Sequence, residues 1–230
     1  MGLRRLARGR TARPRLAVKL TDGAYYEDST LTWRTLPPAP PAADRGNALG
    51  VWTGTEVVVI NGISGNVKSA AFNPVTFTWR TMADPPVDNA ANGSSQAVFV
   101  DGKVLLFSVL EDGATAHDQV ASLDDPQSGQ WTIVAAPPVS LGSGVGVVAA
   151  GSAAIVVGQS NSTNGCNLLH ILAYSPSANS WRELAAGPVA NRAAPVTAWT
   201  GTSIATVTPD GSPLLYNPTT DTWHLGPKIN

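Results

Sequence analysis

The chain has 230 residues and a hydrophobic content of 43%, which is enough for one large all-β domain or two ordinary domains. Charged residues make up only 13%, and the 22 glycines and 18 prolines favour short strands joined by turns over a helical protein. The single cysteine, Cys166, excludes an intrachain disulfide and a zinc site built from several cysteines.

Charge is divided unevenly along the chain. Seven of the fifteen basic residues lie before residue 20, and no acidic residue precedes Asp22, so the remainder carries eight basic and sixteen acidic residues. Residues 1–15 are expected to form a basic disordered tail, although such a head could also bind nucleic acid or an anionic membrane. The acidic remainder predicts a domain that binds no nucleic acid.

The sequence contains no recognisable targeting segment. The apolar run Leu16–Val18 is interrupted by Lys19, which makes it too short for a secretory signal, and no stretch approaches the length of a membrane span. We therefore expect no membrane-spanning segment. The expected location is cytoplasmic by default, or secreted if a signal lies upstream of Met1.

The expected strands, taken in chain order, fall into five groups. The first group, residues 16–36, offers strands around Tyr26 and Trp33, with Leu16–Leu20 as a candidate third. Four further groups are each predicted to supply four strands: residues 46–83, 95–135, 144–185 and 194–226. Each of these begins with an apolar hairpin, as on either side of the turn pair Asp101-Gly102. The whole is predicted to be a single all-β domain from residue 16 to residue 230.

The second hairpin of each group carries an internal repeat, which appears when five tryptophans are aligned. Their spacings are 46, 52, 50 and 42 residues, with an aromatic residue seven positions before four of them and a proline five positions before a different four. The repeat residues are Trp33, Trp79, Trp131, Trp181 and Trp223, with the aromatic residues Tyr26, Phe72, Tyr174 and Tyr216. Because proline after Asn, Asp or Ser presets a type I turn, the pattern predicts an aromatic strand, a turn and a tryptophan strand.

Four strands in roughly 50 residues match one blade of a β-propeller. The aromatic–turn–tryptophan signature, over residues 24–226, resembles the kelch-repeat family of the galactose-oxidase-like propeller superfamily, in a divergent form of bacterial type. The paired glycines of that family survive only in part, as Asn61-Gly62 and Gly158-Gln159. The resemblance implies a kelch-type β-propeller with four full four-stranded blades and a partial N-terminal blade.

Complete propellers of this family are rings of six or seven blades, which leaves two forms open for this chain. It is either a small ring of about five blades or a truncated piece of a six- or seven-bladed ring. A ring that stays open exposes a strand edge to another chain, so the second form predicts self-association.

The order of strands within a blade predicts where its connections emerge. The turns between first and second strands, and between third and fourth, are short and lie at one end. The connections between second and third strands, and between blades, lie at the other end and are long and polar, as in Asn61–Ser69 and Ser108–Asp118. Binding residues concentrate on loops held by a rigid scaffold, so this second end is the candidate ligand-binding face.

Three residues are expected to rim a central channel on that face. Arg45, Asn92 and Arg192 each lie seven residues before an aromatic residue of an innermost strand. Arginine at such a rim can grip a carboxylate or phosphate through two hydrogen bonds, or it can bond carbonyls of the adjacent loop. The neighbouring residues Asp44, Asn89 and Asn191 either complete a polar pocket or cap turns.

The favoured function is a binding scaffold for a protein segment or for a polar or carbohydrate ligand, with no catalytic residue, metal or cofactor assigned. Two alternatives stay open: a carbohydrate-active propeller enzyme similar to a sugar mutarotase or to galactose oxidase, and a fragment without activity of its own. The three histidines, His117, His170 and His224, are scattered over three blades, which argues against a copper oxidase. A mutarotase site needs an acid–base pair and an arginine, for which the candidates are Glu111, Asp112, His117 and Arg45.

Overall fold

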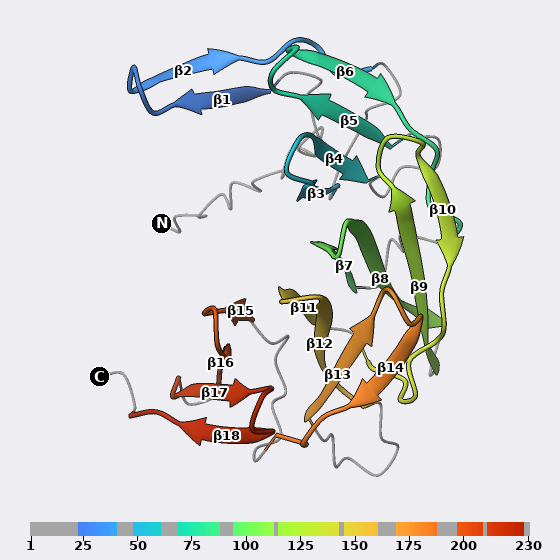
Figure 1. Ribbon diagram of the computed structural model, residues 1–230, viewed down its shortest axis with the longest axis vertical. Coiled ribbons are helices and arrows are strands. Elements are labelled where there is room, and N and C mark those ends of the chain that lie inside the picture. Colours follow the sequence, from blue (N-terminus) through green and yellow to red (C-terminus); the bar gives the residue numbers. More distant parts are fainter. Residues whose placement is uncertain are drawn as a thin grey trace, which may run out of the picture.

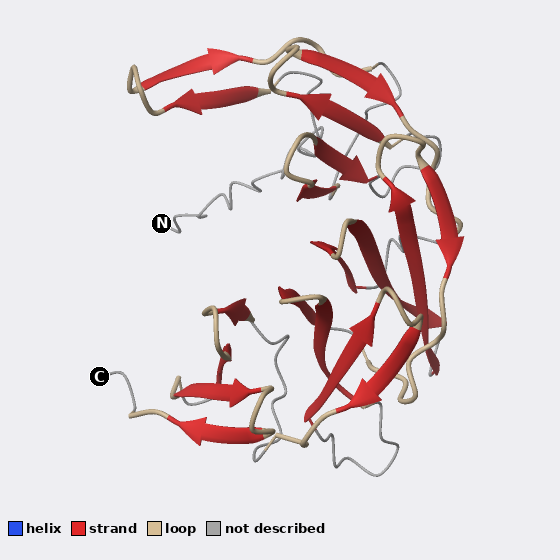
Figure 2. Ribbon diagram, in the orientation of Figure 1, coloured by secondary structure: helices blue, strands red, loops and turns tan. Residues whose placement is uncertain are grey.

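The computed structural model describes residues 23–40, 48–60, 69–87, 94–112, 115–142, 145–160, 169–187, 197–208 and 211–227. Over these ranges the secondary structure consists of strands and turns without a helix (Figure 2). The strands are β1 (Ala24–Glu27), β2 (Thr32–Thr35), β3 (Leu49–Trp52), β4 (Val57–Ile60), β5 (Ala70–Asn73), β6 (Thr78–Thr81), β7 (Ser94–Val100), β8 (Lys103–Asp112), β9 (Thr115–Asp125), β10 (Gln130–Ile133), β11 (Gly146–Ala150), β12 (Ala153–Gln159), β13 (Leu169–Ser175), β14 (Ser180–Glu183), β15 (Ala198–Trp199), β16 (Ile204–Val207), β17 (Pro213–Asn217) and β18 (Thr222–Leu225). The expectation of an all-β protein is therefore confirmed for this part of the chain.

The strands pair in chain order. Four antiparallel sheets contain four strands each, namely β3–β6, β7–β10, β11–β14 and β15–β18, while β1 and β2 form a two-stranded sheet. The sheets follow one another around an open arc, with β3, β7, β11 and β15 on its inner side and the last strand of each sheet on its outer side (Figure 1). Inner strands of consecutive sheets contact one another: β3 contacts β7, β7 contacts β11, and β11 contacts β15. The described sheets do not close into a ring.

One connection differs from its expected form. The sequence predicts a long polar loop over Ser108–Asp118, and this prediction is wrong. Strands β8 and β9 stay paired along this segment as far as Asp112 and Thr115. The pairing satisfies backbone N–H and C=O groups that a loop would leave to water. The candidate third strand of the first group, Leu16–Leu20, lies outside the described residues.

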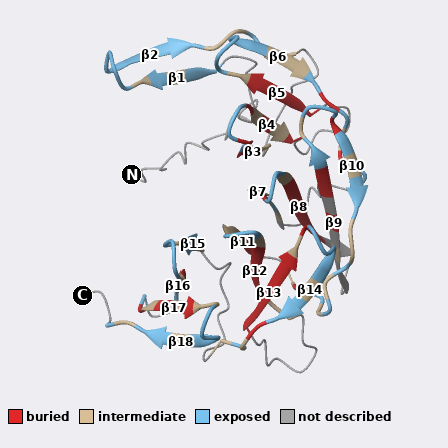
Figure 3. Ribbon diagram, in the orientation of Figure 1, coloured by how far each residue is buried: buried red, intermediate tan, exposed pale blue. Residues whose placement is uncertain are grey.

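The hydrophobic core is divided into clusters that lie between consecutive sheets, from the β3–β6 sheet to the β15–β18 sheet. Leu105–Phe107 of β8 and Ile155–Val157 of β12 are at most 1% exposed. Figure 3 shows this burial along β8, β12 and β13, in contrast with the exposed outer strands β2, β14 and β18. A middle strand is covered on both faces by neighbouring sheets, which explains why its sequence is a continuous apolar run rather than an alternating one.

The repeated hairpin has the same turn in every copy. The residue two positions before each tryptophan has a positive φ, between 47° and 70°, in all five copies: Leu31, Phe77, Gly129, Asn179 and Asp221. At the start of one such turn, Asn73 Oδ1 accepts the backbone N–H groups of Val75 at 2.9 Å and Thr76 at 3.1 Å. Asp125 and Asn217 make the corresponding bonds in their own turns. Side-chain acceptors of this kind stabilise the turn independently of the rest of the fold.

Consecutive sheets are linked by what we call the tryptophan joint. In it, the indole N–H donates to the carbonyl of the residue four positions after the preceding repeat tryptophan. The joints are Trp79 to Pro37 (2.9 Å), Trp131 to Ala83 (3.1 Å), Trp181 to Ala135 (2.7 Å) and Trp223 to Ala185 (3.0 Å). In three of these hairpins the indole also lies against the aromatic residue seven positions earlier, with centroids 4.9–5.1 Å apart. The interval between two successive repeat tryptophans therefore corresponds to one step from a sheet to the next, and each step has one joint.

The first copy of the repeat differs from the other four. Trp33 is 70% exposed and makes no tryptophan joint within the described residues. Its partner Tyr26 is 47% exposed, whereas Tyr174 and Tyr216 at the same position are at most 1% exposed. The local motif is the same, since the Tyr26 and Trp33 rings still pair at 5.5 Å. The difference arises because no described sheet precedes β1 and β2 along the arc.

A second link accompanies the tryptophan joint where the turn residue is Asn or Asp. Asn179 Oδ1 accepts the hydroxyl of Tyr174 at 2.9 Å and the backbone N–H of Ala135 at 3.1 Å. The carbonyl of the same Ala135 is the acceptor of the Trp181 indole. Both polar groups of one backbone residue are thus bonded by the next hairpin, which fixes the position of one sheet against the other.

Asp221 replaces this asparagine in the last sheet, and it makes part of the stability dependent on pH. It accepts the Tyr216 hydroxyl and, at 3.0 Å, the backbone N–H of Ala185. The bond from Tyr216, and then that from Ala185, lowers the pKa of Asp221 below its usual value. The folded chain therefore releases this proton more readily than the unfolded chain. The resulting stabilisation is present above about pH 4 and is lost as the pH falls through the lowered pKa.

We expect Asp221→Asn to remove this acid-dependent contribution, because asparagine accepts the same two bonds without titrating, as Asn179 does in the preceding sheet. Denaturant unfolding followed by circular dichroism, from neutral pH to below about pH 4, measures it. As the pH is lowered, the free energy of unfolding of the wild type should decrease relative to that of the variant. The matched variant Asn179→Asp should acquire the same dependence. A difference between wild type and Asp221→Asn that is constant with pH would contradict the assignment.

Candidate functional site

The antiparallel order of each sheet separates its connections into two ends. The turn end holds the turns between first and second strands and between third and fourth, such as residues 53–56, 74–77 and 126–129. The loop end holds the connections between second and third strands and between sheets, and it is the face predicted for binding. The six residues predicted at its rim lie outside the described residues: Asp44, Arg45, Asn89, Asn92, Asn191 and Arg192.

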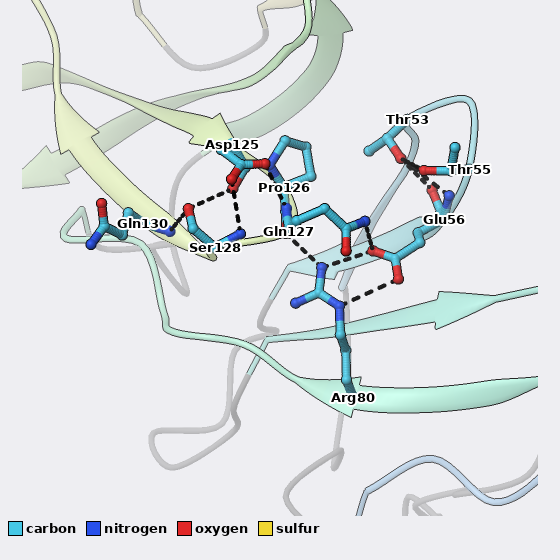
Figure 4. A network of polar contacts seen from close by, with 9 residues as sticks. All are labelled: Thr53, Thr55, Glu56, Arg80, Asp125, Pro126, Gln127, Ser128 and Gln130. Carbon is cyan, nitrogen blue, oxygen red and sulfur yellow. Dashed lines mark hydrogen bonds and ion pairs between the residues drawn. The ribbon is translucent and has the colours of Figure 1, made fainter.

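At the turn end, polar side chains from two sheets bond one another (Figure 4). Glu56, 4% exposed between β3 and β4, accepts two bonds from Arg80 of β6, from Nε at 3.3 Å and from Nη2 at 2.7 Å. Arg80 also donates to the carbonyl of Pro126, and Gln127 Nε2 donates to Glu56 at 3.3 Å. Pro126 and Gln127 belong to the β9–β10 turn of the next sheet. These groups fasten the two sheets together, so they serve the framework rather than a ligand.

At the loop end, a cavity of about 250 Å³ opens between the connection that follows β6 and the outer strands of the β7–β10 sheet. Its lining is apolar apart from one carboxylate and consists of Pro86, Val87, Asp118, Val120, Ile133, Val134 and Ala136. Val87 and Val120 are at most 5% exposed, whereas Ile133 is 69% exposed. The cavity thus has a buried apolar floor and an accessible apolar edge.

The carboxylate of the cavity is held in place by the backbone. Asp118 Oδ2 accepts the N–H of Leu141 at 2.8 Å, and Leu141 itself is fully buried in the core. Asp118 therefore stands at a fixed position in an otherwise apolar wall. A carboxylate in such a place favours a ligand group that carries a positive charge or a hydrogen-bond donor beside an apolar portion.

The size and lining of the cavity limit what it can accept. Sites for whole small molecules usually enclose about 300–1,000 Å³ and combine apolar walls with several converging polar groups. This cavity is smaller and presents a single carboxylate. It suits one apolar or aromatic side chain of a protein segment. It suits a sugar less well, because a sugar needs hydrogen-bonding partners on most of its edges.

A second polar feature of the loop end is the pair formed by His170 of β13 and Glu183 of β14. His170 Nδ1 lies 2.7 Å from Glu183 Oε1, and His170 is 9% exposed. Its Nε2 atom is buried and has no hydrogen-bond partner among the described residues. Within the described ranges, no group of three His, Cys, Asp or Glu side chains is placed to hold a metal ion.

Sequence reasoning identified the loop end as the candidate face but missed the cavity. One wall follows β6, and the other comes from β9, the end of β10 and the segment after it, so the two walls are separate in the sequence. Stacking of one sheet on the next brings them together. A local signal is Val87, a β-branched apolar residue between Pro86 and Asp88 in the connection after β6, which is 5% exposed.

Comparison with models of protein families gives no match for this chain, and no curated protein matches it. The fold and the site therefore define only a class, an all-β protein of sequential four-stranded antiparallel sheets with a small apolar cavity at its loop end. None of the segments that the structure describes forms a helix of the length and apolar character needed to cross a membrane.

Proposed function

We propose that this chain is a kelch-type β-propeller of the galactose-oxidase-like superfamily, and that it is a scaffold that binds a protein segment at its loop end. The propeller is supported by four successive antiparallel sheets, each running from an inner to an outer strand around an arc (Figure 1). It is also supported by the tryptophan joint, which recurs at every step from sheet to sheet.

The observation that carries the binding role is the apolar cavity beside Asp118. A binding segment needs a pocket that removes one anchoring side chain from water, surrounded by polar groups that fix its direction. The cavity supplies the pocket, and Ile133 supplies an accessible apolar edge. In this proposal Arg45 and Arg192, which the sequence predicts at the rim, pair with a carboxylate of the bound segment.

Selection of a displayed library of random peptides on the full-length chain tests this proposal. We expect the selected peptides to share one large apolar residue with a positively charged or hydrogen-bond-donating group beside it to face Asp118, and an acidic residue elsewhere in the segment to pair with the arginines. Their synthetic versions, measured by fluorescence polarisation, should bind Ile133→Glu at least about tenfold more weakly, because the new charge lies at the edge of the anchor pocket. Arg45→Ala combined with Arg192→Ala should weaken the same peptides with little change in melting temperature.

The matched control is Val75→Glu, which introduces the same charge at a residue that is 89% exposed in a turn at the opposite end. It should leave peptide affinity unchanged. Peptides that bind Ile133→Glu as well as they bind the wild type, or a library from which nothing is enriched, would overturn the proposal. A large loss of stability in the double arginine variant would instead assign these arginines to the framework.

A further inference from the structure

The tryptophan joint leaves one unmatched half at each end of the arc. Each joint needs a repeat tryptophan and, from the preceding sheet, the carbonyl four residues after that sheet's own tryptophan. The chain has five such tryptophans and five such positions, the last of which is Pro227. Four joints use four of each. Trp33 and the carbonyl position of Pro227 remain as the unmatched halves among the described residues.

The first unmatched half is an exposed aromatic surface, which we call the aromatic end and define as Tyr26, Leu31 and Trp33. These residues are 47%, 70% and 70% exposed. In the β11–β14 sheet the equivalent Tyr174 is 1% exposed and Trp181 packs into the core cluster that the sheet shares with the preceding one. The aromatic end therefore has the side chains of a sheet contact without the sheet that would cover them.

The second unmatched half is the outward face of the last sheet, which we call the apolar end and define as Ala205, Val207, Pro213 and Leu215. Two cross-strand pairs of the β15–β18 sheet supply it, Ala205 with Leu215 and Val207 with Pro213. The corresponding pairs of the β11–β14 sheet are Ile155 with Ala173 and Val157 with Ile171. Those four residues are at most 9% exposed and pack against the next sheet, whereas Val207 is 43% exposed.

The two ends also match in their hydrogen-bonding groups. Two of the three alanines at the carbonyl position, Ala135 and Ala185, donate their N–H to a side-chain acceptor of the next hairpin, Asn179 or Asp221. At the third, Ala83, the turn residue is Gly129, which has no side-chain acceptor. Where that residue is Pro37, which has no N–H, the next hairpin has Phe77 in the turn and offers no acceptor. Pro227 likewise has no N–H, and the first hairpin has Leu31 in the turn. A joint between the two ends would leave no such donor unsatisfied.

We propose that copies of this chain associate head to tail, with the aromatic end of one copy seated on the apolar end of another. The Trp33 indole of the first copy donates to the carbonyl of Pro227 of the second, which repeats between chains the joint that links sheets within a chain. The two ends lie apart on the open side of the arc (Figure 1), so each copy keeps one free end of each kind. Such a contact is heterologous and extends to a ring or a chain of copies.

Sedimentation velocity of the full-length chain over a wide range of protein concentrations tests this proposal. We expect the mass of the wild type to rise with concentration, and both Trp33→Ala and Val207→Asp to remain monomeric when studied alone. Each of these variants keeps one intact end. An equimolar mixture of the two should therefore form heterodimers that cannot extend further.

The matched control is Trp52→Ala, because Trp52 is also an exposed tryptophan, at 52%, but lies on β3 and at neither end. It should assemble as the wild type does. The proposal is overturned if the wild type stays monomeric at all concentrations, or if the mixture of Trp33→Ala and Val207→Asp does not associate. It is also overturned if Trp52→Ala abolishes assembly as completely as Trp33→Ala. If the two ends instead met within one chain, the wild type would stay monomeric at all concentrations.

Discussion

Replacing Trp181 with alanine should lower the free energy of unfolding by about 3–5 kcal/mol, because it removes a large side chain from the contact between two sheets. The Trp181 ring packs on the cluster between the β7–β10 and β11–β14 sheets, 4.9 Å from Tyr174 and 6.1 Å from Phe107 between centroids. Its removal also leaves the carbonyl of Ala135 without its indole donor. Denaturant unfolding followed by circular dichroism, at a concentration where the chain is monomeric, measures the loss.

Two further variants separate the causes. Trp181→Phe keeps an aromatic ring but removes the indole N–H, so it should cost about 1 kcal/mol from the hydrogen bond alone, with some additional loss of packing. Trp33→Ala is the matched control at the same repeat position, and its stability should stay within about 0.5 kcal/mol of the wild type because Trp33 is 70% exposed. Equal losses for Trp181→Ala and Trp33→Ala would show that the tryptophan joint does not hold the sheets together.

The second large effect is expected at the Glu56–Arg80 pair. The Glu56 side chain is 6% exposed and Arg80 is its charged partner at 2.7 Å. Arg80→Met removes that charge and leaves a buried carboxylate, so we expect the free energy of unfolding to fall by about 3 kcal/mol. The double variant Glu56→Met with Arg80→Met should lose less than Arg80→Met alone, because no buried charge then remains. Denaturant unfolding of the three chains gives the comparison.

Arg34 provides the matched control, because it occupies the same position after the first repeat tryptophan. It pairs with Glu27 at 2.7 Å, but the two side chains are 55% and 31% exposed. An exposed pair contributes little, so Arg34→Met should cost less than about 1 kcal/mol. Equal effects of Arg80→Met and Arg34→Met would show that burial of Glu56 does not set the strength of the pair.

The same contact between sheets explains both the stability of the stacked sheets and the exposed apolar residues at the two ends of the arc. Core clusters cover the β7–β10 and β11–β14 sheets on both faces, and the tryptophan joint is the recurrent part of the contact between sheets. At the ends of the arc the contact stops while the residues that would make it are still present. The proposed head-to-tail association and the stability predicted for Trp181 therefore depend on one set of interactions, which different experiments measure.

The features that depend on neighbours along the chain could be predicted from the sequence. Proline after Asn, Asp or Ser predicted the repeated turns, and in Asn73 the side chain caps its own turn within three residues. Continuous apolar runs predicted the middle strands, since Leu105–Phe107 are buried on both faces. Spacing of the tryptophans predicted the recurrence of one unit. These signals are local, so they can be interpreted without knowing which sheets pack against one another.

The burial or exposure of each copy of a motif could not be predicted from the sequence, because it depends on how the sheets pack. Trp33 and Trp181 have the same local sequence pattern, but Trp33 is 70% exposed whereas Trp181 is partly buried against a core cluster. The cavity beside Asp118 and the ion pair of Glu56 with Arg80 likewise join residues from different parts of the chain. The physical reason is that burial depends on the neighbouring sheet, which a repeat some 50 residues long cannot encode within its own turn and strands.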